Sequence, residues 1–195
     1  YKEIVPKAVD DYLDCIEKSK KQNELQLLMN PVWHVHNGSV PNEDMIMTFS
    51  MLLNLVETSN ADSKELLWKF VKKYKPDILE KNFPIFDALV GYAIKYFNDV
   101  IKAQKKYKTP NENEKLALQS LVNTLEKCND EMLPEDIQTL IYSTGKENGY
   151  VDNLRDWFKL IYEVVFGDEN GPRMGFFISF FGVNETKELL INKLK

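Results

Sequence analysis

Apolar residues recur every three or four positions along most of this chain, which is the spacing of one face of an α-helix. The most regular case is residues 152–166, where apolar side chains fall at i, i+3, i+4, i+7, i+8 and i+11 from Leu154. Gly167 follows, and glycine favours the left-handed conformation that ends many helices. The same spacing predicts further helices over residues 4–20, 43–56, 63–75, 84–106, 110–125, 134–145, 172–181 and 185–194.

Capping signals precede several of these predicted helices. Asn42 is followed by two acidic residues, and Thr109 is followed by proline, both of which are typical of helix starts. Glycine and proline are scarce, at 8 residues each, and no internal repeat is present. Helices joined by short connections predict an all-α protein, a multi-helix bundle or α-helix cage.

The segment 30–41 is the least helical part of the chain, because it contains Pro31, Gly38 and Pro41. We expect at most a short extended segment near residues 31–36. His34 and His36 would share one face of a strand, but a zinc site needs further ligands that are not evident nearby. We therefore interpret both histidines as structural or surface residues and predict no metal site.

Composition narrows the class of protein. The chain is 44% hydrophobic and carries a formal net charge of −5, so it should fold and does not coat nucleic acid over its whole surface. Cys15 and Cys128 form no disulfide or zinc pattern, which favours reduced thiols in the cytoplasm. No apolar run approaches the roughly 18 residues of a membrane span, and no signal peptide is evident. The chain opens at Tyr1 within a helical pattern, so we expect a piece of a longer protein.

A local basic patch remains open on this acidic chain. Lys102, Lys105, Lys106 and Lys108 cluster at the end of the helix predicted over residues 84–106. Lysines at a helix C-terminus compensate the helix dipole, which is one interpretation. The alternative is a set of phosphate contacts.

No catalytic residue can be argued from the sequence. A phosphate-binding loop and a Ser–His–Asp or Cys–His arrangement are both absent from the sequence patterns. The paired carboxylates Asp10 with Asp11 and Asp130 with Glu131 lie among polar residues, as is typical of solvated faces.

The segment 171–175 is the most informative, since two glycines flank an arginine at a predicted helix start. Backbone N–H groups at a helix start lack partners within the helix, so those of Arg173, Met174 and Gly175 could donate to the two carbonyls of an unstacked uracil. Gly175 would let a base come close, and Arg173 could stack on a base or hold a phosphate. The alternative is a simple glycine–proline helix junction.

Several segments together resemble one known family. They are residues 30–38, residues 42–55, residues 89–97, and residues 154–163 followed by Gly171-Pro172-Arg173-Met174-Gly175. In this order, and over nearly the whole chain, they resemble the C-terminal part of class I lysyl-tRNA synthetases. Bacterial glutamyl-tRNA synthetases have a similar helical cage.

The resemblance implies a function for the longer protein. Full-length members of the family join lysine to its tRNA with ATP and magnesium, in a domain carrying His-Ile-Gly-His and Lys-Met-Ser-Lys-Ser-type motifs. Neither motif is in this chain, so the resemblance implies no cofactor here and a catalytic domain upstream. It further implies that residues 1–41 end the stem-contact region and that residues 42–195 form the cage that binds the anticodon of tRNA-Lys, not DNA.

The family's motif also carries over to particular residues. Gly171, Pro172, Arg173, Met174 and Gly175 match the stretch implied to read an anticodon base, although the family often has an aromatic residue at the position of Met174. Arg155 and Lys159 lie on one side of the preceding helix and could meet phosphate. Trp157 and Phe158 fall on its apolar stripe and are predicted to be core residues.

A helical protein–protein docking module is the alternative function, since net acidity and many aromatic residues suit it as well. Salt separates the two predictions, because RNA binding weakens steeply with salt while apolar docking does not. The oligomeric state stays open.

Overall fold

The computed structural model describes residues 4–195, and this part of the chain is all-helical, without a β-strand. The prediction of an all-α protein is therefore confirmed. The α-helices are α1 (Ile4–Ser19), α2 (Glu24–Leu28), α3 (Pro31–Val35), α4 (Phe49–Ser59), α5 (Lys64–Tyr74), α6 (Pro84–Tyr96), α7 (Glu112–Leu125), α8 (Pro134–Glu147), α9 (Leu154–Val165), α10 (Met174–Phe181) and α11 (Val183–Leu194). A 3₁₀ turn, η1 (Glu80–Asn82), precedes α6, and a π-helix, η2 (Phe97–Ile101), and a 3₁₀ turn, η3 (Lys102–Gln104), follow it.

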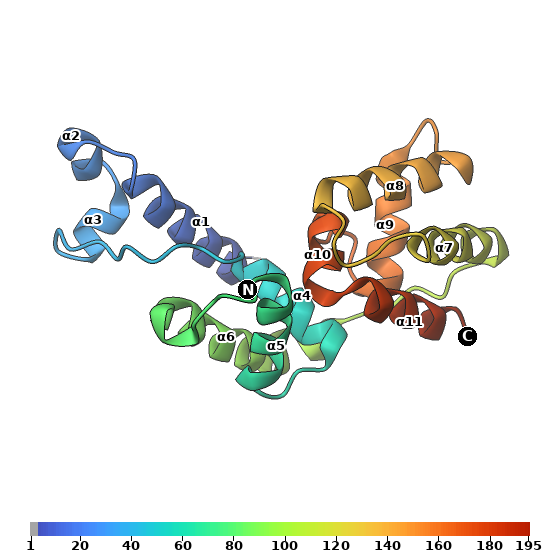
Figure 1. Cartoon of the computed structure of the whole chain (residues 1–195), viewed down its shortest axis with the longest axis horizontal. Coiled ribbons are helices and arrows are strands. Elements are labelled where there is room, and N and C mark those ends of the chain that lie inside the picture. The colour runs from blue at the N-terminus through green and yellow to red at the C-terminus, as the bar shows by residue number, and fades with distance from the viewer. Residues whose placement is uncertain (1–3) are drawn as a thin grey trace.

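The helices form three groups along the molecule (Figure 1). An N-terminal arm consists of α1 with α2 and α3 at its far end. A middle group consists of α4, α5 and α6, and a C-terminal group consists of α7 to α11. Helix α10 packs on α8 of its own group and on α4 and α5 of the middle group, so it joins the two.

One hydrophobic core runs through the middle and C-terminal groups. Helix α9 supplies its clearest example, since Trp157 is fully buried and its indole N–H donates to the Ile141 carbonyl of α8 at 3.0 Å. Gly145 of α8 leaves room for that ring, because a Cβ there would lie 2.4 Å from it. Asn153 caps the start of α9 and Gly167 follows its end with φ +57°, as the pattern predicted.

The predicted start at Asn42 is wrong. Helix α4 begins at Phe49, where the Thr48 hydroxyl accepts from the Met51 N–H at 3.1 Å. The acidic residues after Asn42 serve other helices instead. The Glu43 carboxylate accepts the N–H groups of Ile85 and Phe86 at the start of α6, at 2.8 and 2.7 Å.

The sequence predicts at most a short extended segment near residues 31–36, and the structure forms none there, because residues 31–35 form helix α3. Asn30 caps this helix and Pro31 occupies its first turn, where a missing N–H costs nothing. The rings of His34 and His36 hydrogen-bond to the Leu28 carbonyl at 2.7 Å and the Tyr12 hydroxyl at 2.8 Å. These contacts are structural, as interpreted from the sequence.

Three other helix boundaries shift. The helix predicted over residues 84–106 leaves α-geometry after Tyr96 and continues as η2 and η3. Asn111, rather than Thr109, caps α7 in a reciprocal capping box with Glu114. Helix α10 begins at Met174, so Gly171 and Pro172 lie in the preceding turn.

The described helices include none that is both long and apolar enough to cross a membrane.

Candidate nucleic-acid interface

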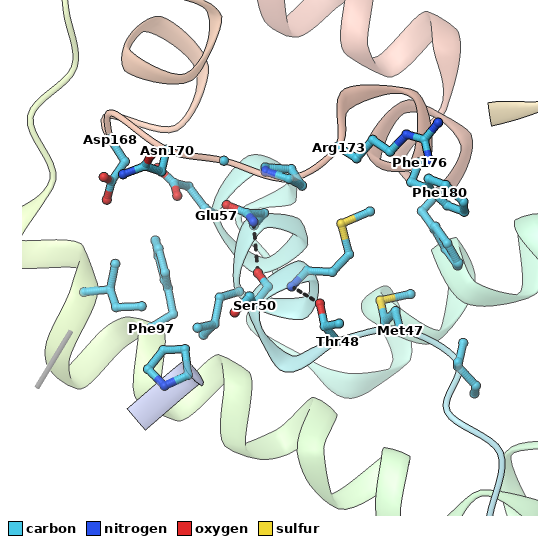
Figure 2. Close-up of a pocket in the computed structure, with 18 of the residues that line it drawn as sticks. Met47, Thr48, Ser50, Glu57, Phe97, Asp168, Asn170, Arg173, Phe176 and Phe180 are labelled. Carbon is cyan, nitrogen blue, oxygen red and sulfur yellow. Dashed lines mark hydrogen bonds between the residues drawn. The ribbon is translucent and has the colours of Figure 1, made fainter. Parts of the chain in front are cut away.

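A cavity of about 690 Å³ lies between the middle group and the C-terminal group. Helix α4, η2, the loop 168–173 and α10 form its walls, and Figure 2 shows Arg173, Phe176 and Phe180 across from Phe97. The apolar part of the lining comprises Met45, Ile46, Met47, Met51, Leu53, Phe97, Ile101, Pro172, Phe176 and Phe180. A cavity of this size and character suits a planar, partly apolar ligand.

Arg173 is exposed where the loop enters α10, and its guanidinium carbon lies 5.4 Å from the centre of the Phe176 ring. This cation–π contact holds the guanidinium plane without a carboxylate partner. An arginine held in this way can stack on a base or bind a phosphate with its outer N–H groups. The structure places the exposed Arg173 in the lining of this cavity, and its role in binding stays a prediction.

Two more cations line the same cavity, and sequence reasoning missed both. Lys7 comes from α1 and Lys75 from the residue after α5, and both are exposed. Within residues 4–195, no carboxylate lies within ion-pair distance of Lys7, Lys75 or Arg173. Three elements distant in sequence thus bring cations to one largely apolar cavity, whose lining also contains the carboxylates of Glu57 and Asp168. Hydrogen bonding to Lys20 lowers the pKa of Asp44, and the charge of Lys75, which lies beyond ion-pair distance, also helps to lower it.

A buried ion pair closes one wall of the cavity. The Lys105 ammonium lies 2.7 Å from the Glu57 carboxylate of α4 and donates to the Phe166 carbonyl at 2.6 Å. The Tyr107 hydroxyl donates to the other Glu57 oxygen at 2.6 Å. Burial raises the pKa of Glu57 above its ordinary value, although both donors act to lower it. Burial and the adjacent Glu57 carboxylate together raise the pKa of Tyr107.

The four lysines of the predicted basic patch therefore differ in their environment. The ammonium of Lys105 forms an ion pair with Glu57. The ammonium of Lys108 pairs with Glu114 at 2.7 Å and with Glu163 at 3.5 Å. Lys102 and Lys106 expose theirs to solvent. The arrangement favours a structural role for Lys105 and Lys108, and phosphate contact stays a prediction for Lys102 and Lys106.

The turn before α10 rests on Tyr162, a side chain of the neighbouring helix α9. The Tyr162 hydroxyl of α9 donates to the Pro172 carbonyl at 2.9 Å, and a Cβ on Gly171 would lie 2.4 Å from the Tyr162 ring. Burial raises the pKa of Tyr162 to about 12, so this hydroxyl remains a donor at neutral pH. Gly171 and Arg173 are consequently displayed on the surface.

Gly175 has a different role from the one predicted. Its N–H donates to the Gln138 side-chain oxygen at 2.8 Å, and a Cβ there would lie 2.0 Å from the Pro134 carbonyl oxygen. The glycine allows α10 to pack closely on α8, and its N–H is not available to a base. Met174 is buried, with 1% of its surface exposed, so it offers no stacking surface.

Arg155 and Lys159 lie on α9, away from the cavity lining. Lys159 pairs with Glu169 at 3.1 Å and with Glu163 at 3.8 Å, whereas Arg155 is exposed. The structure thus does not bring these two residues together with Arg173. As predicted, Trp157 is a core residue, and Phe158 is partly buried against the core.

The fold and the site together define the class of this protein: it is all-helical and has an apolar cavity lined by cations. The chain is 40% identical to the lysine–tRNA ligase of Roseobacter denitrificans over 190 residues, which cover 97% of this chain and 36% of that relative. It is 40% identical to the lysine–tRNA ligase of Rickettsia felis over 194 residues, 98% of this chain and 37% of the relative.

The chain is therefore homologous to part of the lysine–tRNA ligases, as the resemblance indicated, and spans just over a third of the length of these curated relatives. No family model matches the chain, and no solved structure matches it.

Proposed function

We propose that this chain is the tRNA-binding part of a class I lysine–tRNA ligase and that it reads the anticodon of tRNA-Lys. The observation that carries the proposal is homology to lysine–tRNA ligases along 97% of the chain. Lysine activation with ATP and magnesium then belongs to the part of the ligase outside this chain, and the whole enzyme works in the cytoplasm. Binding, rather than chemistry, is the role of the residues described here.

The cavity supports this proposal because it matches the requirements of an unstacked base. Its apolar walls exclude water from the faces of a base, and Arg173 can stack on a base or hold its phosphate. Lys7 and Lys75 can hold neighbouring phosphates in the same way. Base stacking on such platforms contributes about 1–3 kcal/mol per base.

The predicted division at residues 41 and 42 falls in the connection between α3 and α4. We propose that the arm belongs to the stem-contact region and that the middle and C-terminal groups form the anticodon cage. The cavity lies within the second of these parts, except for the contributions of Pro6 and Lys7 from α1.

The test is binding of this chain to tRNA-Lys transcripts, with the native anticodon and with its uridines replaced. The proposal expects weaker binding to the altered transcript and a steep decrease of affinity with salt for both. Equal affinity for the two transcripts would reject anticodon reading. Absence of tRNA binding at low salt would favour the alternative, a protein–protein docking module.

A further inference from the structure

Helices α2 and α3 (residues 24–35) lie at the far end of the arm and are here called the tip (Figure 1). The tip carries several exposed apolar side chains. Leu25 is 77% exposed, Met29 84% and Val35 67%, and Leu28 is 50% exposed. These four side chains, here called the patch, expose far more apolar surface within one short segment than isolated surface positions would, and such surface marks docking sites. None of the four belongs to the core that runs through the other two groups.

The arm is proposed to belong to the stem-contact region, but the charge of its tip argues against RNA as the partner of the tip itself. The sequence contains neither lysine nor arginine between Lys21 and Lys64, and Glu24 is the only carboxylate of α2 and α3. Without cations, the tip cannot neutralise phosphates, which supply most of the affinity for nucleic acid. An apolar protein surface is the partner that this chemistry fits.

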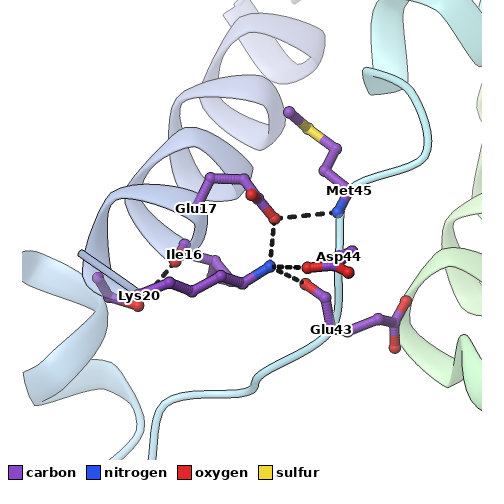
Figure 3. A network of polar contacts seen from close by, with 7 residues as sticks. Ile16, Glu17, Lys20, Glu43, Asp44 and Met45 are labelled. Atoms are coloured by element: carbon purple, nitrogen blue, oxygen red, sulfur yellow. Dashed lines mark hydrogen bonds and ion pairs between the residues drawn. The ribbon is translucent and has the colours of Figure 1, made fainter.

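The arm is held firmly to the rest of the molecule (Figure 3). The Lys20 ammonium bridges Glu17 at 2.6 Å, Asp44 at 2.7 Å and the Glu43 carbonyl at 2.9 Å. The Glu43 side chain in turn accepts two N–H groups at the start of α6. Helix α1 also packs on α4, where the Asp10 carboxylate accepts the N–H groups of Phe49 and Ser50, so a contact made at the tip would bear on the position of the middle group.

The comparisons supply the occupant of the patch. The two relatives are lysine–tRNA ligases in which the matched part is 36% and 37% of the length, so nearly two thirds of each lies outside it. We propose that the tip docks on an apolar surface of the part of the ligase polypeptide that lies outside this chain. This inference rests on the proposed function, and it assigns the arm the role of a rigid spacer between that part and the cation-lined cavity.

Hydrogen exchange of residues 24–36 tests the docking directly. The exchange is measured in the isolated 195-residue chain and in the complete ligase polypeptide that carries it. The proposal expects amides of the tip to exchange at least about tenfold more slowly in the complete ligase, because docking suppresses local opening. Equal exchange in the two proteins would overturn the proposal. Protection in the isolated chain that grows with its concentration would also overturn it, because a second copy would then be the occupant.

A paired substitution provides the second measurement. Leu25→Asp with Met29→Asp should leave the melting temperature of the isolated chain and its tRNA affinity unchanged, since both side chains are already in solvent. In the complete ligase, the same pair should abolish the protection and lower lysylation. Leu116→Asp is the matched control, because Leu116 is 69% exposed on α7 of the C-terminal group.

The outcomes separate this inference from the proposed function. If the paired variant loses the protection of the tip but still binds tRNA, the docking of the tip is supported and the anticodon proposal is unaffected. Tip protection in a ligase whose isolated chain binds no tRNA would reject the anticodon proposal and retain the docking. Unchanged protection and lysylation in the paired variant would reject the docking.

Discussion

Lys105 and Glu57 form an ion pair of 2.7 Å in which the side chains are only 9% and 4% exposed, and it joins α4 to the segment that enters the C-terminal group. We predict that Lys105→Met destabilises the chain by about 3 kcal/mol, because it leaves a buried carboxylate without its cation. The double variant with Glu57→Gln should cost less than Lys105→Met alone. Urea unfolding measures both, and the exposed Lys102→Met should change stability by less than about 0.5 kcal/mol.

Arg173→Ala should weaken binding of tRNA-Lys by about 1–2 kcal/mol, since it removes the cation above Phe176 from the cavity. Circular dichroism should report an unchanged fold, because the side chain is exposed. Arg155→Ala is the informative comparison, as it removes an exposed arginine that does not line the cavity. A larger loss for Arg155→Ala than for Arg173→Ala would shift the binding surface from the cavity to α9.

Lys75→Ala should reduce the salt dependence of tRNA binding by about one phosphate contact, a slope of roughly 0.7 in the plot of log affinity against log salt for a single strand. The reason is that Lys75 lines the cavity and pairs with no carboxylate of the described residues. Lys146→Ala on α8, which is also exposed, should leave the slope unchanged. Identical slopes for wild type and Lys75→Ala would contradict the assignment of Lys75.

Gly175→Ala should destabilise the chain by about 1–3 kcal/mol, as expected of overpacking against a neighbouring backbone. The new Cβ would meet the Pro134 carbonyl oxygen, which cannot swing aside. Gly91→Ala is the control, because the atom in its way is the flexible Lys64 side chain and a helical alanine is favoured over glycine. Thermal unfolding of the two variants in parallel measures the difference in their stability. Equal melting temperatures would contradict the close packing of α10 on α8.

Acid should remove the stabilising effect of Asp87. The Lys64 ammonium, at 2.6 Å, lowers the pKa of Asp87 below 3.8, and the Trp68 indole adds a hydrogen bond that opposes the effect of burial. A lowered pKa in the folded state stabilises the fold above the ordinary pKa, and this contribution is lost as pH falls through the lowered value. Asp87→Asn should therefore be less stable than wild type at pH 7, with the difference narrowing in acid below about pH 4.

Urea unfolding as a function of pH measures that narrowing. Asp152→Asn, at an exposed position before α9, should show little difference at any pH. A stability difference between Asp87→Asn and wild type that stays constant down to pH 3 would contradict the role of the Lys64 ion pair.

Helices with local signals on both sides were predictable from the sequence. Helix α9 has a regular apolar stripe, an asparagine cap and a terminal glycine, and its observed bounds differ from those predicted by one or two residues at each end. The start at Asn42 failed because Glu43 makes its hydrogen bonds with α6, more than 40 residues later. A rule that considers only neighbouring residues cannot predict a hydrogen bond to so distant a helix.

The cavity could be predicted only in part for the same reason. Arg173 was singled out because its glycines and proline form a local pattern, and the structure places it in the cavity lining. Lys7 and Lys75 carry no such signal, since they approach Arg173 only when the arm, the middle group and the C-terminal group are packed together. The role of Gly175 was misassigned because its neighbour, Gln138, lies 37 residues earlier on α8.

Three helices are capped at their starts by carboxylates that belong to distant segments of the chain, and these caps can form only late in folding. Asp10 accepts N–H groups at the start of α4, Glu43 at the start of α6 and Asp130 at the start of α11. A helix whose first turn is completed from 39 to 53 residues away gains that stabilisation only after the chain has closed on itself. A peptide of α6 alone should consequently be frayed at its first turn, and α4, α6 and α11 should reach their full stability only after the segments that carry these carboxylates have packed against them.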